Sequence, residues 1–275
     1  MLKTLKNKRA SVTFDTLGVH LQSFQVDGKE YLWQRDPAYW AKTAPVLFPY
    51  IGAVPDESPV KIYGKDTKMP RHGFIKDTEM TLVSESDTSQ VYETVDNEAT
   101  WEMFPYHFKF TATYELKDDK LILSYNVENT GDEEMPYLIG GHPAFFCPMN
   151  EGEQFTDYEI IFNKKEEDPA LVDGQVLPLS YDLFPIDAHI VDDVNSDMIS
   201  LVNKDTKKGI EFEFSPFKMM AIWSPPHKNA PFVCLEPWNN GTFETLQNPE
   251  FSEKKHLQKL QPGENKTYMF SIKPV

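Results

Sequence analysis

Cysteine is nearly absent from this sequence. Its 275 residues include two, Cys147 and Cys234, and neither lies in a CxxC pair or at a Cys/His spacing typical of a zinc site. Sequence alone leaves a disulfide open, but free thiols are the default in a reducing compartment. We therefore expect two buried thiols that take no part in catalysis.

Long apolar runs are also missing. No segment approaches the roughly 20 apolar residues that a membrane-spanning helix needs. The N-terminal residues 1–9 carry positive charge, but no apolar stretch follows them as it does in a secretory signal. We expect a cytoplasmic protein that has no membrane partner.

Basic residues are in deficit. Lys and Arg number 27 against 43 Asp and Glu, which gives a formal net charge of −16. Because such a charge repels nucleic-acid phosphates and anionic lipids, the sequence predicts no nucleic-acid partner. A neutral substrate is the easier fit, and a phosphorylated one would need a local basic patch.

Several common catalytic and nucleotide-binding motifs are absent too: HExxH, G-x-S-x-G, GxxxxGK[ST] and a strand-bound GxGxxG. Metalloprotease, serine-hydrolase, P-loop and Rossmann functions therefore have no support.

The chain does show a regular alternation of apolar and polar residues. The clearest case is the pair of segments 110–116 and 121–127, on either side of Asp118-Asp119. This pattern predicts a hairpin with one buried face. A second hairpin is expected between residues 24–26 and 31–33, because Asp27-Gly28 suits the positive φ angles of a tight turn.

The rest of the sequence favours strands over helices. The 21 prolines and 13 glycines leave little room for long helices, and we expect one short helix over 253–260, where Leu257 and Leu260 share a face. Many short strands, with no linker and no repeat, favour an all-β fold: a large antiparallel β-sandwich with few short helices, in a single domain over residues 1–275. The further strands are expected at 158–162, 210–214, 219–223, 232–235 and 268–272.

Three short segments carry side chains suited to proton transfer. They are Gly140-Gly141-His142-Pro143-Ala144-Phe145, Arg71-His72-Gly73-Phe74 and Leu235-Glu236-Pro237-Trp238. Together they supply two histidines, a carboxylate and an aromatic wall, each beside a Gly or Pro that permits or restricts unusual backbone geometry. We expect the Gly pair to let the backbone approach a ligand, and Pro237 to end regular strand pairing after Glu236.

These segments resemble the aldose 1-epimerase (galactose mutarotase) family, and especially its branch associated with bacterial lactose operons. Further matches follow in the family's order from about Val12 to Ile272, so the resemblance covers nearly the whole chain. It implies the galactose mutarotase-like sandwich, a small-molecule sugar as the partner, and a reaction that needs neither a metal nor an organic cofactor. The further matches are residues 44–49, 222–225, 231–238 and 260–264.

The family's reaction opens a sugar ring by removing the proton of the C1 hydroxyl and protonating the ring oxygen O5. The resemblance places the catalytic glutamate at Glu236, which we expect to act as the base. We expect His142 to act as the acid, because an imidazole with a pKa near 6.5 can give and recover a proton. His72 resembles the second active-site histidine, which holds the sugar and its ring oxygen. An isolated Glu or His would more often have a structural role, but the ordered set of motifs favours catalysis.

Four further residues are expected to bind the sugar. Trp223 and Trp238 would stack against the apolar face of a pyranose, although core packing is the alternative for each. Arg71 would donate charged hydrogen bonds, and it reaches the pocket together with His72 only if their segment is a loop. Asp187 resembles the family's sugar-binding aspartate.

The chain departs from the family in its arginines. Where relatives read Gly-Phe-Ala-Arg, this sequence reads Gly73-Phe74-Ile75-Lys76, and no arginine follows the Phe-Pro-x-x-Gly of residues 48–52. Three alternatives to a free-aldose mutarotase therefore stay open. One is a carbohydrate-binding or regulatory protein without catalysis, and another is a glycoside hydrolase using Glu236 with Asp187. The third is a hexose-6-phosphate mutarotase, which would require Lys42, Lys76 or Lys228 near the pocket.

Overall fold

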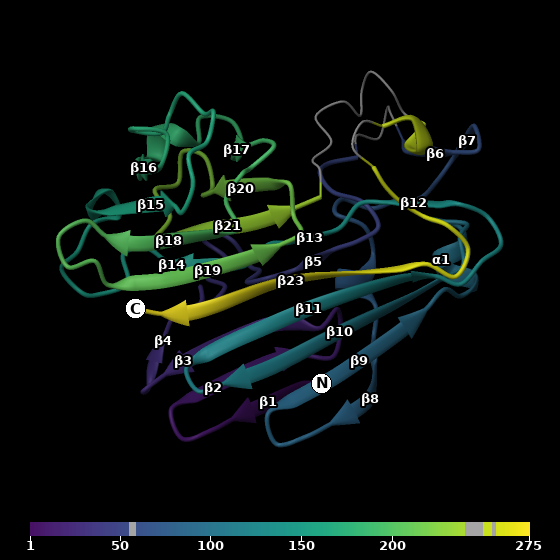
Figure 1. Ribbon diagram of the computed structural model, residues 1–275, viewed down its shortest axis with the longest axis horizontal. Coiled ribbons are helices and arrows are strands. Elements are labelled where there is room, and N and C mark those ends of the chain that lie inside the picture. Colours follow the sequence, from purple (N-terminus) through teal and green to yellow (C-terminus); the bar gives the residue numbers. More distant parts are fainter. Residues whose placement is uncertain (55–58, 240–249, 255–256) are drawn as a thin grey trace.

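The large sheet is built from the alternating segments of the sequence. The computed structural model describes residues 1–54, 59–239, 250–254 and 257–275, and in these ranges nine antiparallel strands form one sheet (Figure 1). Its central hairpin pairs Phe110 with Val127, as the alternation predicted, and the apolar side chains of both strands are buried on one face. In spatial order the strands are β16 (Val176–Pro178), β15 (Tyr158–Phe162), β18 (Met198–Asn203), β19 (Gly209–Ser215), β23 (Asn265–Pro274), β11 (Lys120–Asn129), β10 (Phe108–Lys117), β9 (Ser89–Val95) and β8 (Thr81–Glu85).

A smaller antiparallel sheet contains the N-terminal strands. Its last hairpin turns at Asp27 and Gly28, whose φ angles are +50° and +84°, so the predicted tight turn is confirmed. The returning strand extends only to Glu30, and the N–H of Tyr31 adds one more bond, to the oxygen of Phe24 at 3.1 Å, before the pairing ends. Leu32 then bridges Phe145, because the chain leaves this sheet to pair with β14 (Ala144–Phe146). The strands are β1 (Leu2–Lys6), β2 (Ala10–Asp15), β3 (His20–Val26) and β4 (Lys29–Glu30).

A third sheet carries the motif segments. Its strand β21 (Phe232–Trp238) is longer than predicted, since Pro237 pairs with Met220 and Trp238 with Met219. The expectation that Pro237 ends the pairing is therefore wrong, because the neighbouring residues carry the ladder past the missing N–H. The other strands are β17 (His189–Val191), β20 (Met219–Trp223), β13 (Gly140–Gly141) and β5 (Val46–Leu47), and β14 also pairs with β21.

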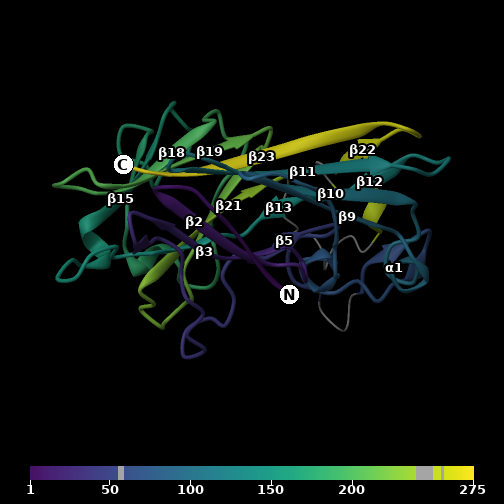
Figure 2. The same cartoon turned by 90° about the horizontal axis from the view of Figure 1, so that it is seen from below.

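The two smaller sheets cover one face of the large sheet. Phe14 of β2 stacks on Tyr114 of β10 with ring centroids 4.1 Å apart, and Phe145 of β14 meets Phe212 of β19 edge-on. Figure 2 shows β2, β21 and β13 on the same side of β23 and β11. The predicted all-β antiparallel sandwich is confirmed.

The Gly pair before His142 serves protein packing. A Cβ atom on Gly140 would lie 2.7 Å from Cδ1 of Trp238, and one on Gly141 would lie 2.8 Å from Cε1 of Phe270 in the large sheet. Both distances are too short for a real side chain. The backbone here approaches neighbouring side chains of the same protein, so packing alone already requires glycine at both positions.

Helices in the described ranges are short, as predicted. The helix expected over 253–260 is wrong: a 3₁₀ turn ends at Glu253, residues 255–256 lie outside the described residues, and β22 (Gln258–Leu260) pairs with β12 (Met135–Tyr137). Leu260 reaches the core as part of a strand instead. Across all the residues that the structure describes, no helix is long and apolar enough to cross a membrane. The remaining elements are the ribbon of β6 (Lys61–Ile62) and β7 (Lys65–Asp66), the helix α1 (Glu98–Trp101), and the 3₁₀ helices η1 (Ile75–Asp77), η2 (Phe155–Asp157), η3 (Tyr181–Leu183) and η4 (Phe251–Glu253).

Candidate active site

The register of one strand pair brings the carboxylate and the imidazole together. Gly140 pairs with Trp238 and Ala144 with Cys234, both on β21. Between these two pairs the register places His142 opposite Glu236, where side chains on the same face are close neighbours. Nε2 of His142 lies 3.3 Å from Oε2 of Glu236. Two residues far apart in the sequence thus form one buried pair.

Burial shifts the two pKa values in opposite directions. The exposed fractions of Glu236 and His142 are 1% and 7%. Burial, followed by the charge of Asp187, raises the pKa of Glu236 well above its usual value, while Arg71 and the indole of Trp238 act against the rise. Burial, followed by His72, lowers the pKa of His142. A buried pair of this kind favours its uncharged form, a protonated carboxyl beside a neutral imidazole.

Aromatic rings enclose His142 on several sides. The indole of Trp40 stacks on the imidazole with centroids 4.9 Å apart and planes inclined by 22°, while Trp223 and His72 meet it edge-on at 5.7 Å. The main-chain oxygen of Trp40 accepts a hydrogen bond of 2.8 Å from Nε1 of Trp33. Trp40 was missed in the sequence analysis. The available signal was an aromatic pair, Tyr39-Trp40, in a segment bounded by prolines.

A strained loop holds His72 in place. Its φ is +62°, a left-handed conformation that is costly for a residue with a side chain. The N–H of His72 donates to the oxygen of Gly52, and the N–H of Gly52 donates to Nδ1 of His72 at 3.2 Å. Nε of Arg71 lies within donating distance of Nε2, at 3.3 Å. Since a neutral imidazole has one acceptor nitrogen, the bond from Gly52 requires the proton on Nε2, and the bond from Arg71 requires it on Nδ1. Burial is the main cause that lowers the pKa of His72 to about 3.

Arg71 and His72 lie in a loop. Neighbouring residues on a strand would point to opposite faces, whereas a loop allows both side chains to reach the site. Arg71 lies close enough to lower the pKa of Glu236 and of both histidines. Lys42 also affects both histidines, and Lys76 adds to the effect at His72. Lys76 is buried and contacts Asp77 and the oxygen of Gly73. These three cations, Lys42, Arg71 and Lys76, form a basic wall in an acidic protein.

Lys228, the third lysine considered for a phosphate group, contacts the segment of Trp40 instead of joining this basic wall. Its Nζ donates to the main-chain oxygens of Ala38 and Tyr39 at 3.1 and 3.0 Å, and so supports the segment that carries Trp40.

The other predicted sugar-binding residues lie at different depths. Trp223 is half-buried and belongs to the aromatic enclosure. Trp238 is 6% exposed and packs in the core against Gly140. Its indole N–H lies near enough to the Glu236 carboxylate to lower the pKa of that group. The geometry of this approach does not amount to a hydrogen bond, so Nε1 has no bonded partner among the described residues. Asp187 is exposed on the segment before β17, near enough to raise the pKa of Glu236.

Several buried polar atoms around the pair have no hydrogen-bond partner among the described residues. Ser224 follows Trp223 on the chain, and the main-chain oxygen of Thr43 accepts the N–H of Ala144 beside the site. Since buried polar groups almost always have partners, these orphan atoms remain to be paired by water or by a polar ligand. They are Thr43 Oγ1, Ser224 Oγ, Trp238 Nε1, Glu236 Oε2 and His142 Nδ1.

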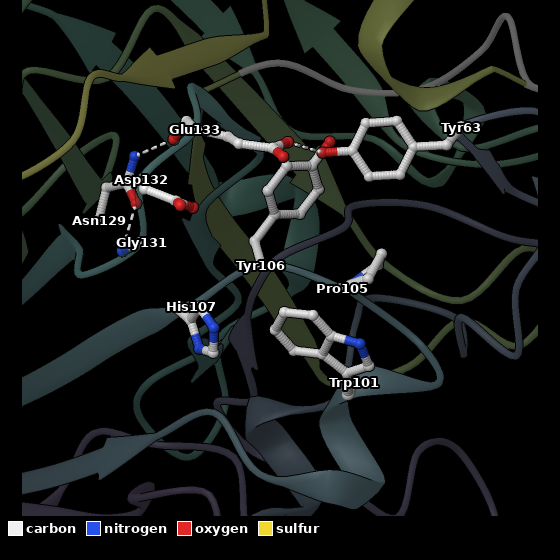
Figure 3. A pocket seen from close by; sticks show the side chains of 9 residues that line it. All are labelled: Tyr63, Trp101, Pro105, Tyr106, His107, Asn129, Gly131, Asp132 and Glu133. Carbon is white, nitrogen blue, oxygen red and sulfur yellow. Dashed lines mark hydrogen bonds between the residues drawn. The ribbon is translucent and has the colours of Figure 1, made fainter.

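A separate cleft of about 340 Å³ lies elsewhere on the surface. Its lining includes Tyr63, Trp101, Tyr106 and Glu133, and the hydroxyl of Tyr63 donates to the Glu133 carboxylate at 2.7 Å (Figure 3). No candidate catalytic residue lines it.

Comparisons with known proteins agree with the fold and the motifs. The profile of the aldose 1-epimerase family matches residues 1–273. The chain is 31% identical over 294 aligned positions to the plasmid and chromosomal LacX proteins of Lactococcus lactis subsp. lactis, and the alignment covers 98% of this chain and 97% of theirs. A galactose mutarotase-like protein from Lactobacillus casei superposes with a TM-score of 0.91 at 27% identity, covering all of both chains. A galactose mutarotase related enzyme from Lactobacillus acidophilus gives 0.89 at 26% identity, covering 100% of this chain and 97% of the other. The chain belongs to the aldose 1-epimerase family.

Proposed function

We propose that the protein is an isomerase, an aldose 1-epimerase that interconverts the α and β anomers of a free aldose such as galactose or glucose. The observation that carries the proposal is the buried contact between His142 Nε2 and Glu236 Oε2 at 3.3 Å. The two reacting oxygens of the sugar, the C1 hydroxyl and O5, are bonded to the same carbon. A base and an acid that lie this close can therefore face both oxygens at once.

The reaction is a transfer of two protons within the complex. It starts from the charged form of the pair, with Glu236 ionised and His142 protonated, which is the less favoured form in the buried site. Glu236 takes the proton of the C1 hydroxyl, His142 gives its proton to O5, and the bond between C1 and O5 breaks to leave an open-chain aldehyde. The pair ends with a protonated carboxyl and a neutral imidazole, which is the form that burial favours. After rotation about the bond between C1 and C2, the reverse transfers close the ring on the other face. The pair then regains its starting protons, so no cofactor or metal is consumed.

The surrounding groups have supporting roles. His72, in the tautomer that the bond from Gly52 requires, with its proton on Nε2, donates a hydrogen bond to the sugar near O5. Arg71 stabilises the ionised form of Glu236 and donates to sugar hydroxyls. Trp223 offers aromatic surface to the C–H face of the ring, and the Asp187 carboxylate accepts hydrogen bonds from sugar hydroxyls at the rim. Trp238 packs in the core and does not offer such a surface. The orphan polar atoms near the pair support a ligand with several hydroxyl groups.

Polarimetry of freshly dissolved α-galactose and α-glucose tests this function. We expect faster approach to anomeric equilibrium than in buffer, and loss of about 100-fold or more of that acceleration in Glu236→Gln and His142→Asn. His227→Gln is a matched control, because His227 is exposed and is not among the residues of the site. If several aldoses equilibrate no faster with the protein than without it, while a titration still shows sugar binding, the non-catalytic carbohydrate-binding alternative takes its place.

The basic wall favours a second candidate, a hexose-6-phosphate mutarotase. Lys42 has no ion pair within the described ranges, and burial, followed by the positive charge of Lys76, lowers its pKa. An unpaired cation beside the site is suited to a phosphate group. If this candidate is correct, Lys42→Gln weakens acceleration for glucose 6-phosphate much more than for glucose.

The glycoside hydrolase alternative gains no support from the geometry. Glu236 lies against an imidazole, while Asp187 is exposed and its side chain accepts a hydrogen bond from the N–H of Ala188.

We propose further that the protein acts in the cytoplasm. Cys147 and Cys234 are both free and buried, as predicted, which suits a reducing compartment.

A further inference from the structure

Strand β21 places a thiol beside the candidate catalytic pair. Cys234 lies two positions before Glu236, and because side chains alternate along a strand, both point to the same face. Cys234 is fully buried and packs with Trp33, Ala144 and Phe232. Neither the sequence motifs nor the proposed mechanism gives this thiol a role.

The three side chains form a compact set of donors. One ligand atom each from His142, Cys234 and Glu236 lies within 4.8 Å of the other two, and the nitrogen and oxygen are 3.3 Å apart. Zinc binds nitrogen, oxygen and sulfur ligands at about 2.0 to 2.3 Å, so two ligands of a tetrahedral ion lie about 3.3 to 3.6 Å apart. The imidazole and the carboxylate already have that separation. A movement of the thiol by roughly 1 Å completes the geometry, and rotation of one short side chain supplies it.

The charges also suit a divalent ion. A thiolate and a carboxylate together neutralise Zn²⁺, which removes the main penalty of burying an ion in this apolar setting. The donor set of sulfur, nitrogen and oxygen is one that zinc accepts, and three protein ligands leave a fourth position for water.

We propose that His142, Cys234 and Glu236 bind a zinc ion reversibly, and that the bound ion blocks the site against sugar. Zinc on Nε2 and on the carboxylate holds the two groups that move protons. The thiol proton of Cys234 and the carboxyl proton of Glu236 both pass to solvent when the ion binds. The effect on catalysis rests on the proposed mutarotase function, whereas the binding itself does not.

Cobalt titration tests the binding directly. The purified full chain is titrated with Co²⁺ in a buffer without thiols or phosphate, and the near-ultraviolet absorption of a cobalt–thiolate bond is followed. We expect saturation at one ion per chain, and displacement of the cobalt signal by Zn²⁺. In Cys234→Ala we expect the thiolate band to disappear and the affinity for zinc to fall by about 100-fold or more. Even the loss of a group that only supports a ligand costs 10-fold to 100-fold in metal affinity.

Cys147→Ala is the matched control, because Cys147 is the other buried free thiol and is absent from the donor set. It keeps the cobalt band and the sensitivity to zinc. Cys234→Ser serves as a second variant of closer volume, and circular dichroism verifies that each variant is folded. A thiolate band that persists in both Cys234 variants, or no saturable band in the unaltered protein, overturns the proposal.

Polarimetry separates this inference from the proposed function. Zinc slows anomer equilibration by the unaltered protein and by Cys147→Ala, while Cys234→Ala retains its activity at the same zinc concentration. Equal inhibition of all three proteins overturns the assignment of Cys234 as a ligand. A protein that binds cobalt through Cys234 but never accelerates equilibration refutes the function and leaves the metal site supported.

Discussion

Two half-buried histidines, His20 and His72, predict that the protein loses stability in mild acid. Burial is the main cause that lowers the pKa of His20 to about 4 and of His72 to about 3, and the charge of Lys42 adds to the effect on both. In the unfolded chain each histidine titrates near 6.5. Below that pH the unfolded state binds more protons than the folded state, so the free energy of unfolding falls as the pH decreases.

The size of the loss follows from the same values. At pH 5 the solution lies about 1.5 units below the pKa of an unfolded histidine, while both folded histidines remain mostly neutral. Each unit corresponds to about 1.4 kcal/mol, so each histidine lowers the free energy of unfolding by about 2 kcal/mol. The loss continues until the pH reaches the folded pKa, near 4 for His20 and near 3 for His72.

Urea unfolding measures this loss. Tryptophan fluorescence gives the free energy of unfolding near pH 7.5 and near pH 5 for the unaltered protein, His20→Gln and His72→Gln. We expect each variant to lose about 2 kcal/mol less than the unaltered protein between the two conditions. His227→Gln, at an exposed position, provides the control and keeps the full loss. If the His20 and His72 variants both show the same decrease as the unaltered protein, the account of neutral half-buried histidines is wrong.

Three other predictions concern packing, positioning and cooperativity. Gly141→Ala places a methyl group against Phe270 and lowers the free energy of unfolding by about 1 to 3 kcal/mol, whereas Gly131→Ala, with nothing nearer than 3.4 Å, costs much less in the same urea assay. Trp40→Ala removes the stack on His142 and lowers kcat by up to about 100-fold in polarimetry, while Trp40→Phe retains most of the rate. We propose that residues 1–275 form one domain, so fluorescence and far-ultraviolet circular dichroism should report one coincident unfolding transition; separate transitions would refute this.

The sequence predicted the parts of the fold that depend on local patterns. The hairpin of β10 and β11 follows from strict alternation, since a single buried face requires it. The turn at Asp27-Gly28 follows from the φ angles that these residues tolerate. Residues 31–33 were predicted to pair with residues 24–26, but Leu32 bridges Phe145 of β14, more than 100 residues away in sequence. Such pairings leave no local signal.

The errors have a common physical cause. Leu257 and Leu260 have a spacing that fits a helix, but β12 offers Leu260 a strand partner instead. Pro237 cannot donate a hydrogen bond, yet its neighbours sustain the ladder with β20. Tertiary contacts decided both cases against the local preference.

The net charge gave only a partial guide to the site. A charge of −16 disfavours anionic partners for the surface as a whole. Lys42, Arg71 and Lys76 nevertheless converge where their charges lower the pKa of His72. Because they come from separate positions in the chain, their joint effect could be read only after folding. The charges that act on His72 are thus opposite in sign to the formal charge of the chain.

The candidate catalytic pair and the fold depend on the same strand register. Gly140 and Ala144 pair with Trp238 and Cys234, and this alignment alone sets His142 across from Glu236. A slip of one residue along β21 would turn Leu235 toward the site and Glu236 into the apolar core, because side chains alternate with period two. Burying a carboxylate there without a partner would cost several kcal/mol. The packing of Gly141 against Phe270 opposes the same slip. The contacts that fix the sandwich therefore also fix the distance between the two groups proposed to move protons.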